Sequence, residues 1–225
     1  MTFTVAVTRP EPQCSQTAAR LEKIGYQVRS APLLVAKDVG DWGPADNIGS
    51  LAITSRTAAM RLAHHPQFHT IPTFCVGKAS AADARRSGAL HVESADGDVE
   101  TLFALLCEKA KPPIVHVGGE DQKGDLAGRL MEAGWAAERR VIYKMAPSEA
   151  LPSVEGPLDA VLLYSPRTAK IFTRYATHSP WREAACVVLS TAVAAPVRST
   201  TVCKVAERPN EEALFKALAA LRDGG

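Results

Sequence analysis

The chain of 225 residues lacks the signatures of several protein classes. No stretch approaches the ~20 apolar residues of a membrane span, so we expect no membrane partner. No Lys/Arg run exceeds two residues, only 13 residues are aromatic and the net charge is +2, which argues against nucleic-acid binding. The five cysteines form no CxxC pair and are odd in number, so they predict thiols of a reduced compartment.

Common catalytic and cofactor fingerprints are also missing. The sequence contains no GxGxxG, HExxH or GxSxG. Gly119 and Gly124 have the spacing of a phosphate loop, but Asp125 and Leu126 replace its Lys and hydroxyl residue. The six histidines lack ligand spacing and are interpreted as surface or strand residues. We therefore expect no cofactor and no metal. Residues 1–5 predict a strand and not a signal peptide, so we expect a cytoplasmic protein.

What is present is an internal repeat with a period of about 110 residues. The helical segment 17–26 matches 127–135 at an offset of 109 and pairs Gly25 with Gly134. The segment 100–106 matches 212–218 at an offset of 112. Two similar units that face each other would form a cleft, where small-molecule sites collect.

Short apolar runs alternate with helical patterns along the whole chain. This alternation predicts α/β units with parallel sheets whose strands are buried on both faces. Two helices are well signalled, one at 99–109 after Asp98 and one at 211–222 after Pro209-Asn210. Strands are expected at 3–8, 27–36, 50–54, 72–76, 90–92, 113–117, 138–145, 159–164, 185–189 and 201–205, and helices are expected to start near 12, 56, 78, 98, 123, 166, 191 and 209.

The division into domains has two solutions. A tandem arrangement gives domains 1–110 and 112–225. A crossed arrangement gives one domain from 1–35 plus about 150–225, and another from 36–145. The polar or Pro-rich segments 38–49 and 146–157 flank the middle block and favour the crossed arrangement.

Several strand ends carry residues suited to an anionic ligand. Arg9 follows the first strand, where it either faces the ligand crevice of an α/β sheet or caps a neighbouring helix. The junctions Thr54-Ser55-Arg56 and Ser165-Pro166-Arg167 lead into helices, whose free N–H groups bind anions, although Ser and Thr also cap ordinary helices. Similar junctions occur at Gly77-Lys78-Ala79-Ser80, Gly118-Gly119 and Ser190-Thr191-Ala192.

Taken in order, these motifs resemble those of the uroporphyrinogen-III synthase family. The resemblance runs from residue 3 to about 218 and rests on the series, because each motif is short: Val7-Thr8-Arg9-Pro10, Ile53-Thr54-Ser55-Arg56, Val76-Gly77-Lys78-Ala79-Ser80-Ala81, Val141-Ile142-Tyr143 and Leu163-Tyr164-Ser165-Pro166. It implies two flavodoxin-like parallel-sheet domains joined by a two-stranded connector, with one domain at 1–35 plus 148–225, the other at 38–143, and connectors at 34–38 and 143–147.

The resemblance also implies a reaction and a site. Hydroxymethylbilane would be cyclised with loss of water and inversion of ring D, by a monomer that receives it from the preceding pathway enzyme. Tyr143 matches the family's tyrosine and would be the general acid, unless it only packs at the hinge. The substrate-binding set would be Arg9, Thr54, Ser55, Arg56, Gly77, Lys78, Ser80, Gly118, Gly119, Ser165, Pro166, Arg167, Ser190, Thr191 and Ala192.

The segment 190–194 departs from the family pattern, because its hydroxyl is displaced or missing. Only backbone binding is therefore expected there. Two other functions stay open: a non-catalytic two-domain protein that binds an anionic metabolite, and a synthase-like domain that regulates a partner.

Overall fold

The computed structural model describes residues 2–122, 124–149, 155–177, 180–197 and 202–224. His178 and part of the expected segment 146–157 lie outside this range. The described chain divides into two compact units, which we call unit 1 (1–35 and 146–225) and unit 2 (36–145). The chain passes from one unit to the other inside β3 and again inside β8, which are neighbours in one sheet.

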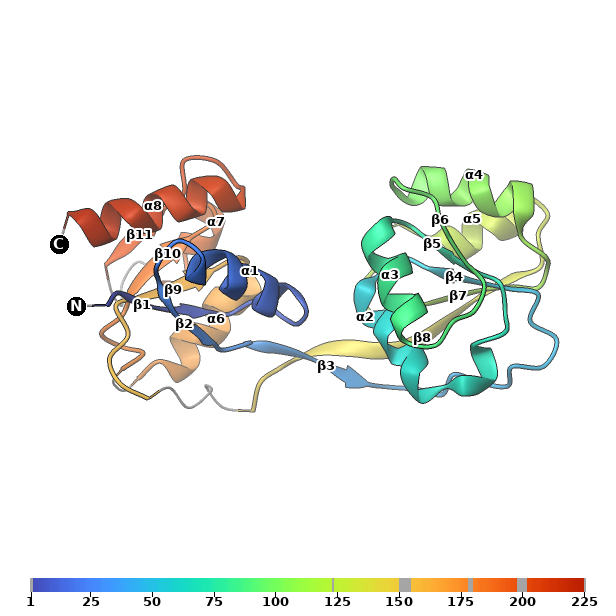
Figure 1. Ribbon diagram of the computed structural model, residues 1–225, viewed down its shortest axis with the longest axis horizontal. Helices are drawn as coiled ribbons and strands as arrows, with labels where there is room; N and C mark the ends of the chain where they lie inside the picture. Colours follow the sequence, from blue (N-terminus) through green and yellow to red (C-terminus); the bar gives the residue numbers. More distant parts are fainter. Residues whose placement is uncertain (1, 123, 150–154, 178–179, 198–201, 225) are drawn as a thin grey trace. The chain divides into compact units, whose positions relative to one another are not determined.

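Unit 1 contains a five-stranded parallel sheet in the order β11-β10-β9-β1-β2 among the described residues. Helices α1 and α8 pack through Leu21, Leu214 and Leu218 on the same face, and α6 lies on the other side of the sheet (Figure 1). The strands are β1 (Thr4–Val7), β2 (Gln27–Ser30), β9 (Ala160–Leu163), β10 (Ala185–Val188) and β11 (Cys203–Val205), and the helices are α1 (Gln13–Glu22), α6 (Pro166–Tyr175), α7 (Thr191–Ala194) and α8 (Glu211–Asp223).

Unit 2 contains the second sheet, in the order β3-β8-β7-β4-β5-β6. Along β4, Leu51 and Ile53 face a core shared with α2 and α3, whereas Ala52 faces a core shared with α4 and α5. The elements are β3 (Leu34–Asp38), β4 (Ser50–Ile53), α2 (Arg56–Arg61), η1 (Leu62–His64), η2 (Pro66–Phe68), β5 (Thr73–Cys75), α3 (Lys78–Arg86), β6 (Val92–Ser94), α4 (Val99–Lys109), β7 (Ile114–Gly119), α5 (Leu126–Glu132) and β8 (Ala137–Pro147).

The predicted parallel α/β organisation is confirmed by these sheets. Asp98 caps α4 by accepting hydrogen bonds from two backbone N–H groups, and Asn210 caps α8 through the N–H of Ala213. The expected strand 27–36 is wrong in one respect, because it is two strands that belong to different sheets. Pro32 lies between β2 and β3, and proline has no N–H to continue a strand ladder.

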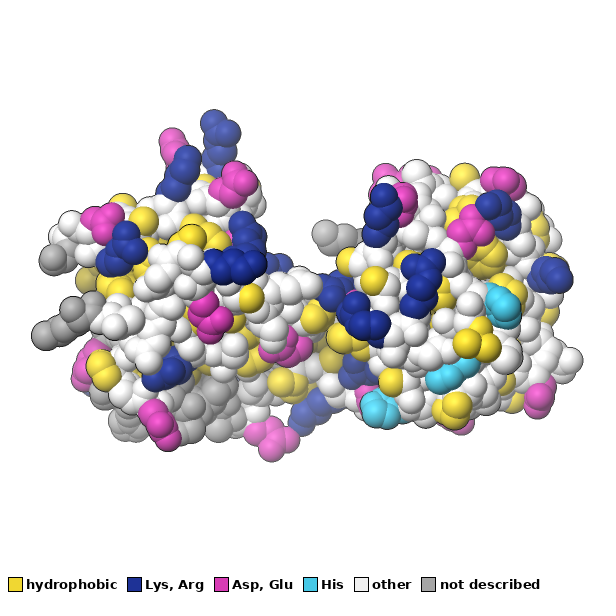
Figure 2. Space-filling model, in the orientation of Figure 1, with side chains coloured by type: hydrophobic (Ala, Val, Ile, Leu, Met, Phe, Trp, Pro, Cys, Tyr) yellow, Lys and Arg dark blue, Asp and Glu magenta, His cyan; other side chains and the backbone are white. Residues whose placement is uncertain are grey.

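The segment 38–49 also differs from the expected linker. The Trp42 indole is only 5% exposed, stacks on the His65 ring with 4.4 Å between centroids and contacts Phe68. This segment is therefore packed onto the core of unit 2. All histidine side chains visible in Figure 2 lie in the same unit.

The repeat and the two units are related by an exchange of elements. Unit 2 runs β4-α2-β5-α3-β6-α4-β7-α5-β8, and unit 1 shows the same succession when it is read from β9 to α8 and then from β1 to β2. The strand orders β6-β5-β4-β7-β8 and β11-β10-β9-β1-β2 then correspond strand for strand. Each unit is thus built from one piece of each sequence repeat.

Candidate functional site

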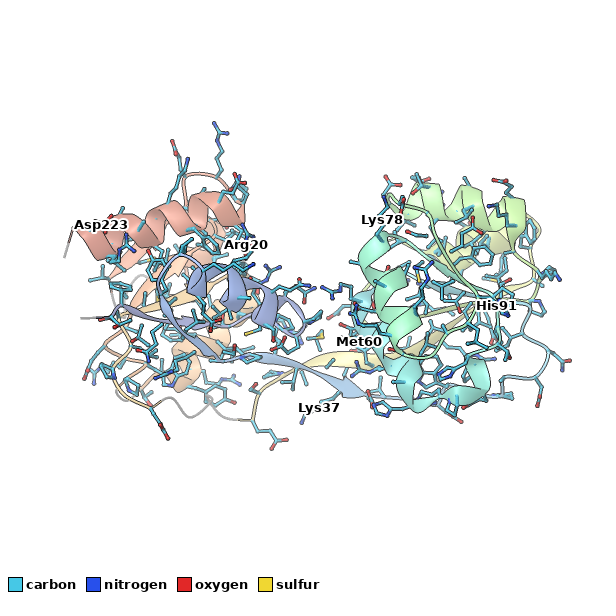
Figure 3. All side chains as sticks on the ribbon, viewed as in Figure 1. Arg20, Lys37, Met60, Lys78, His91 and Asp223 are labelled. Atoms are coloured by element: carbon cyan, nitrogen blue, oxygen red, sulfur yellow. The ribbon has the colours of Figure 1, made fainter. Side chains whose placement is uncertain are left out.

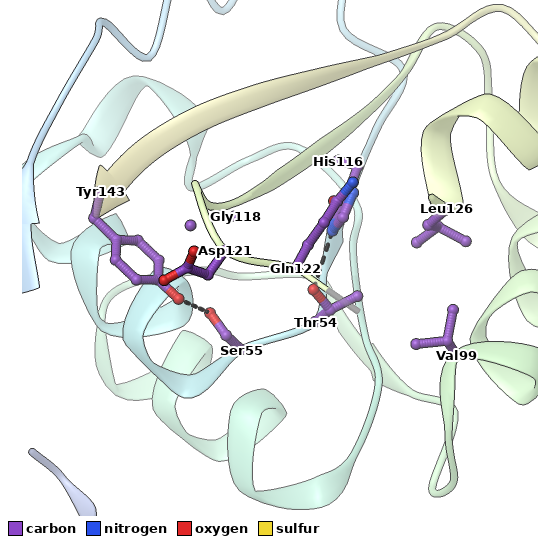
Figure 4. A pocket seen from close by; sticks show the side chains of 10 residues that line it. Thr54, Ser55, Val99, His116, Gly118, Asp121, Gln122, Leu126 and Tyr143 are labelled. Carbon is purple, nitrogen blue, oxygen red and sulfur yellow. Dashed lines mark hydrogen bonds between the residues drawn. The ribbon is translucent and has the colours of Figure 1, made fainter. Parts of the chain in front are cut away.

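The principal pocket of unit 2 lies where β4 and β7 end. It has a volume of about 260 Å³. Carboxyl ends of parallel strands are the usual place for ligands in α/β proteins. Figure 4 shows the pocket, which is lined by Thr54, Ser55, Val99, His116, Gly118, Gly119, Asp121, Gln122, Leu126 and Tyr143.

Tyr143 and Ser55 form the first hydrogen-bonded pair of the pocket. The Tyr143 hydroxyl donates to Ser55 Oγ over 3.1 Å, from β8 to the start of α2 (Figure 4). The same Oγ caps α2 by accepting the Ala58 N–H over 3.1 Å. Because Ser55 Oγ accepts two hydrogen bonds, its own hydrogen can be donated to a third group. Thr54, Gly118 and Gly119, which are also in the predicted set, line the same pocket.

The position of the Tyr143 ring is fixed from two sides. A Cβ atom at residue 119 would lie 2.6 Å from Tyr143 Cζ, so only glycine allows the ring to approach the end of β7. The Arg61 guanidinium lies 4.9 Å from the ring centroid. Arg61 is itself held by the Asp38 carboxylate and the Ala36 carbonyl, both on β3. The phenol is therefore a preorganised group.

His116 and Thr54 form the second pair. His116 lies in β7, is 3% exposed and has its Nε2 atom 3.0 Å from Thr54 Oγ1. Its Nδ1 atom is buried and has no hydrogen-bond partner among the described residues. Burial, helped by the charge of Arg139, lowers the pKa of His116 to about 4. The imidazole is therefore neutral near pH 7.

The other predicted residues of unit 2 do not line this pocket. Arg56 pairs with the buried Asp83 carboxylate, with 2.5 Å between Nε and Oδ2. Lys78 begins α3, is 83% exposed and pairs with Asp96 (Figure 3). The Ser80 hydroxyl donates to the Gly77 carbonyl at the start of the same helix. Arg56 and Lys78 are thus engaged in ion pairs, one buried and one exposed, and Ser80 bonds within the first turn of its own helix.

In unit 1, Arg9 belongs to a compact cluster around Glu211, the first residue of α8. Arg9 Nη1 lies 3.1 Å from Glu211 Oε1, and the guanidinium lies 4.7 Å from the centroid of the Tyr164 ring. The same carboxylate accepts hydrogen bonds from Thr17, from Arg20 and from the Tyr164 hydroxyl. Burial, with the nearby Glu211, raises the pKa of Tyr164 well above its ordinary value.

The remaining predicted residues also belong to unit 1. Ser165 caps α6 through the N–H of Thr168, and Pro166 and Arg167 are its exposed first residues. Ser190 precedes α7, whose first residues Thr191 and Ala192 are exposed. These two junctions and Arg9 follow the strands β9, β10 and β1, whose carboxyl ends share one edge of the sheet. The structure thus brings Arg9, Ser165 and Ser190 to one edge of unit 1.

Sequence reasoning misses half of the unit 2 pocket. The pattern around His116 indicates a plain strand or surface histidine, and no motif selects Asp121 or Gln122. Val99 and Leu126 are the first residues of α4 and α5 and contribute apolar wall. The one available signal for His116 is its place two residues before Gly118, at the end of a buried strand.

The described residues contain neither a membrane span nor a metal cluster. No described helix is both long and apolar enough to cross a membrane. In the same ranges, no three His, Cys, Asp or Glu side chains come together as a metal site requires.

Parallel sheets flanked by helices, with a pocket where the strands end, define the class of α/β proteins that bind small molecules at this edge of the sheet. The family model described as "Uroporphyrinogen-III synthase HemD" matches residues 15–216. The chain therefore belongs to the uroporphyrinogen-III synthase family, whose members are cyclising lyases of haem biosynthesis.

One solved structure supports the fold directly. The chain is similar to the uroporphyrinogen-III synthetase from Helicobacter pylori 26695, with 18% identity, a TM-score of 0.61 and coverage of 99% of this chain and 100% of that one. A weaker similarity relates it to a mutant uroporphyrinogen III synthase from Thermus thermophilus, with 14% identity, a TM-score of 0.45 and full coverage of both chains. No curated protein matches the chain.

Proposed function

We propose that this chain converts hydroxymethylbilane into uroporphyrinogen III, with Tyr143 as the general acid of the unit 2 pocket. The observation that carries the assignment of the acid is the Tyr143 hydroxyl. It reaches the pocket as a hydrogen-bond donor, is held by Gly119 and Arg61, and donates to Ser55. A positioned donor of this kind supplies about 10²–10⁴-fold in rate.

The chemical steps fit such a donor. The Tyr143 proton passes to the terminal hydroxyl of the substrate as the C–O bond breaks, so water leaves and a protonated azafulvene (azafulvenium) cation forms. Ring D then attacks the methylene carbon of this cation through its substituted position. The resulting spiro intermediate opens and closes again with ring D inverted, and the proton released on closure restores the phenol. Beyond the acid, the protein holds a flexible substrate in one folded shape.

The eight carboxylates of the substrate are the groups that the remaining predicted residues would hold. In unit 2 these are Thr54 and Ser55 with Arg56, the Gly77–Ser80 junction with Lys78, and Gly118 with Gly119. Free N–H groups near helix starts and strand ends favour anions. In unit 1 they are Arg9, the first turn of α6 from Ser165 to Arg167, and the backbone of Ser190, Thr191 and Ala192.

Further parts of the proposal concern the whole molecule. The two units act as two domains, with β3 and β8 as connector strands. When the strands of unit 1 are numbered along the chain, they have the flavodoxin order 2-1-3-4-5. When β3 is left out and the strands β4 to β8 of unit 2 are numbered in the same way, they have the order 3-2-1-4-5. The protein works as a cytoplasmic monomer that receives its substrate from the preceding enzyme. The buried thiols of Cys14, Cys75 and Cys186 suit a reducing compartment.

The test is a product analysis. Freshly prepared hydroxymethylbilane is incubated with the protein, the products are oxidised to porphyrins, and the type I and type III isomers are separated. Heat-denatured protein and buffer alone give the spontaneous type I background. Predominantly type III product is the expected result. Only type I, at the background rate and from well-folded protein, would overturn the synthase assignment and favour a binding protein for an anionic metabolite.

A further inference from the structure

His116 is a buried polar residue that the proposed acid step does not use. It is 3% exposed, and yet it lines the pocket. The strand does not need it, because β1 corresponds to β7 and has Ala6 at the equivalent position. Ala6 pairs in register with Arg29 as His116 pairs with Arg139. A buried imidazole in place of a methyl group costs desolvation energy, so its retention needs a reason.

The two ring nitrogens of His116 have different surroundings. Strand β7 lies between β4 and β8. On the β4 side, Nε2 lies 3.0 Å from Thr54 Oγ1, and both residues line the pocket (Figure 4). A methyl group added at Gly118 would lie 3.6 Å from this same nitrogen. On the β8 side is Arg139, whose charge acts on the ring more strongly than the opposite charge of Asp125, and Nδ1 has no hydrogen-bond partner among the described residues.

These surroundings select one neutral tautomer. A neutral imidazole carries its hydrogen on one nitrogen and a lone pair on the other. With the hydrogen on Nδ1, a buried N–H without an acceptor would be placed in the field of the Arg139 cation. With the hydrogen on Nε2, the lone pair of Nδ1 experiences that cation favourably. Nε2–H then donates to Thr54 Oγ1.

This tautomer determines how the Thr54 hydroxyl can bond. Its oxygen accepts from His116, so its hydroxyl hydrogen is released for another acceptor. The neighbouring Ser55 oxygen accepts from Tyr143 and from the Ala58 N–H, which releases its hydrogen in the same way. Two adjacent hydroxyl groups at one pocket edge are thus arranged as donors, and a carboxylate accepts two such hydrogen bonds.

We propose that His116 is a positioning residue that keeps the Thr54 hydroxyl as a hydrogen-bond donor to one carboxylate of the substrate. The inference rests on the proposed function, because it takes the polycarboxylate as the ligand of this pocket. It assigns to His116 a role in binding and none in the departure of the hydroxyl.

The test compares substitutions along this chain of contacts. His116→Leu and Thr54→Val each remove one member and are expected to raise KM about tenfold while kcat stays within about twofold. His116→Gln can still present an N–H to Thr54, and Thr54→Ser keeps the hydroxyl, so both should keep KM near the wild-type value. The double variant H116L/T54V should bind no more weakly than either single variant, because the two residues act as one unit.

Binding is also measured without turnover. Fluorescence quenching by uroporphyrin III, a stable octacarboxylate, should show the same order of affinities. If His116→Leu does not fold, His116→Asn takes its place, because its amide is too short to reach Thr54. Wild-type KM and porphyrin affinity in the His116 and Thr54 variants would overturn the inference. So would additive effects in the double variant, or parallel losses of kcat and Tm, which are marks of a structural role.

Failure of the proposed function is recognised separately. A wild-type protein that gives only type I product fails as a synthase, whatever the variants do. In that case the porphyrin affinities still decide whether His116 acts through Thr54. Isomer analysis therefore tests the synthase activity, whereas porphyrin affinity tests the role of His116.

Discussion

Units 1 and 2 have equivalent strands in the same spatial arrangement, but they differ in the side chains at the edge where these strands end. In unit 2 this edge contains an open pocket, whose wall includes Thr54, Val99, Gly119 and Leu126. The corresponding residues of unit 1 are Tyr164, Glu211 and Arg9, matched by their places in equivalent elements, and Thr17, matched to Leu126 by the repeat offset of 109. These four form one hydrogen-bonded cluster.

The same backbone frame thus supports an open cavity and a filled one. Glycine and short or apolar side chains leave space in unit 2, whereas an arginine and a glutamate meet across the equivalent space in unit 1. Side-chain volume and charge at these four positions therefore distinguish the two edges. Unit 2 has an open pocket there, and unit 1 has an internal hydrogen-bonded cluster.

The strongest test of this division is the same chemical change made once in each unit. Tyr143→Phe removes the proposed acid and should lower kcat about 100-fold or more, with little change in Tm. Tyr164→Phe removes a hydroxyl that bonds to Glu211 and Thr17 within the unit 1 cluster, and it should leave kcat within about threefold. Steady-state kinetics with isomer analysis measures both. Equal losses in the two variants, or full activity in Tyr143→Phe, would contradict the division.

A second difference between the units is the buried His116, where unit 1 has Ala6. The pKa of His116 is about 4 in the folded protein, below its unfolded value of about 6.5. Between these values the unfolded chain binds more protons, so stability falls as pH falls. From pH 7 to pH 5 this group alone should cost about 2 kcal/mol.

The measurement is urea unfolding of wild type and His116→Gln at both pH values. The variant should lose about 2 kcal/mol less than wild type over this range. The difference between the two proteins isolates His116, because the carboxylates titrate in both. An identical loss in the two proteins would show that the histidine is not held neutral by the fold.

The smallest expected effect concerns the filled edge of unit 1. Glu211→Ala leaves Arg9, Thr17 and Tyr164 without their shared acceptor and should lower the free energy of unfolding by about 1–2 kcal/mol. Glu212→Ala is the matched control, because it removes the same charge from the same first turn of α8. Chemical denaturation compares the two. Equal stabilities would mean that the cluster contributes no more than the charge at a helix start.

Much of the fold could be predicted from local pattern. The short apolar strands, the caps Asp98 and Asn210, and the repeat offset near 110 are all visible without coordinates. The failure at 27–36 has a physical origin, because an extended run does not reveal which sheet each half joins. Only the pairing of β2 with β1 and the place of β3 beside β8 separate them.

The site was less predictable. Thr54 and Ser55 follow a strand, Gly118 and Gly119 end one, and Tyr143 came from family resemblance, so each had a signal. His116 had little, because a histidine inside a strand resembles any core residue until its neighbours are known. Arg56 shows the opposite problem: its place at a helix start suggested a ligand, but it pairs with Asp83, a residue from another helix.

The exchange of elements between the repeats also determines the order in which the two units can be completed during translation. Unit 2 is a continuous stretch and has all of its strands once residue 145 has left the ribosome. The piece β1-α1-β2 is made first but pairs with β9, which begins at Ala160. Because translation proceeds at about 5–20 residues per second, one edge of β1 stays unpaired for roughly 6–25 s before β9 is made. The piece β1-α1-β2 is therefore made before unit 2 but completed after it, and its open strand edge is the natural point for chaperone contact or misassembly.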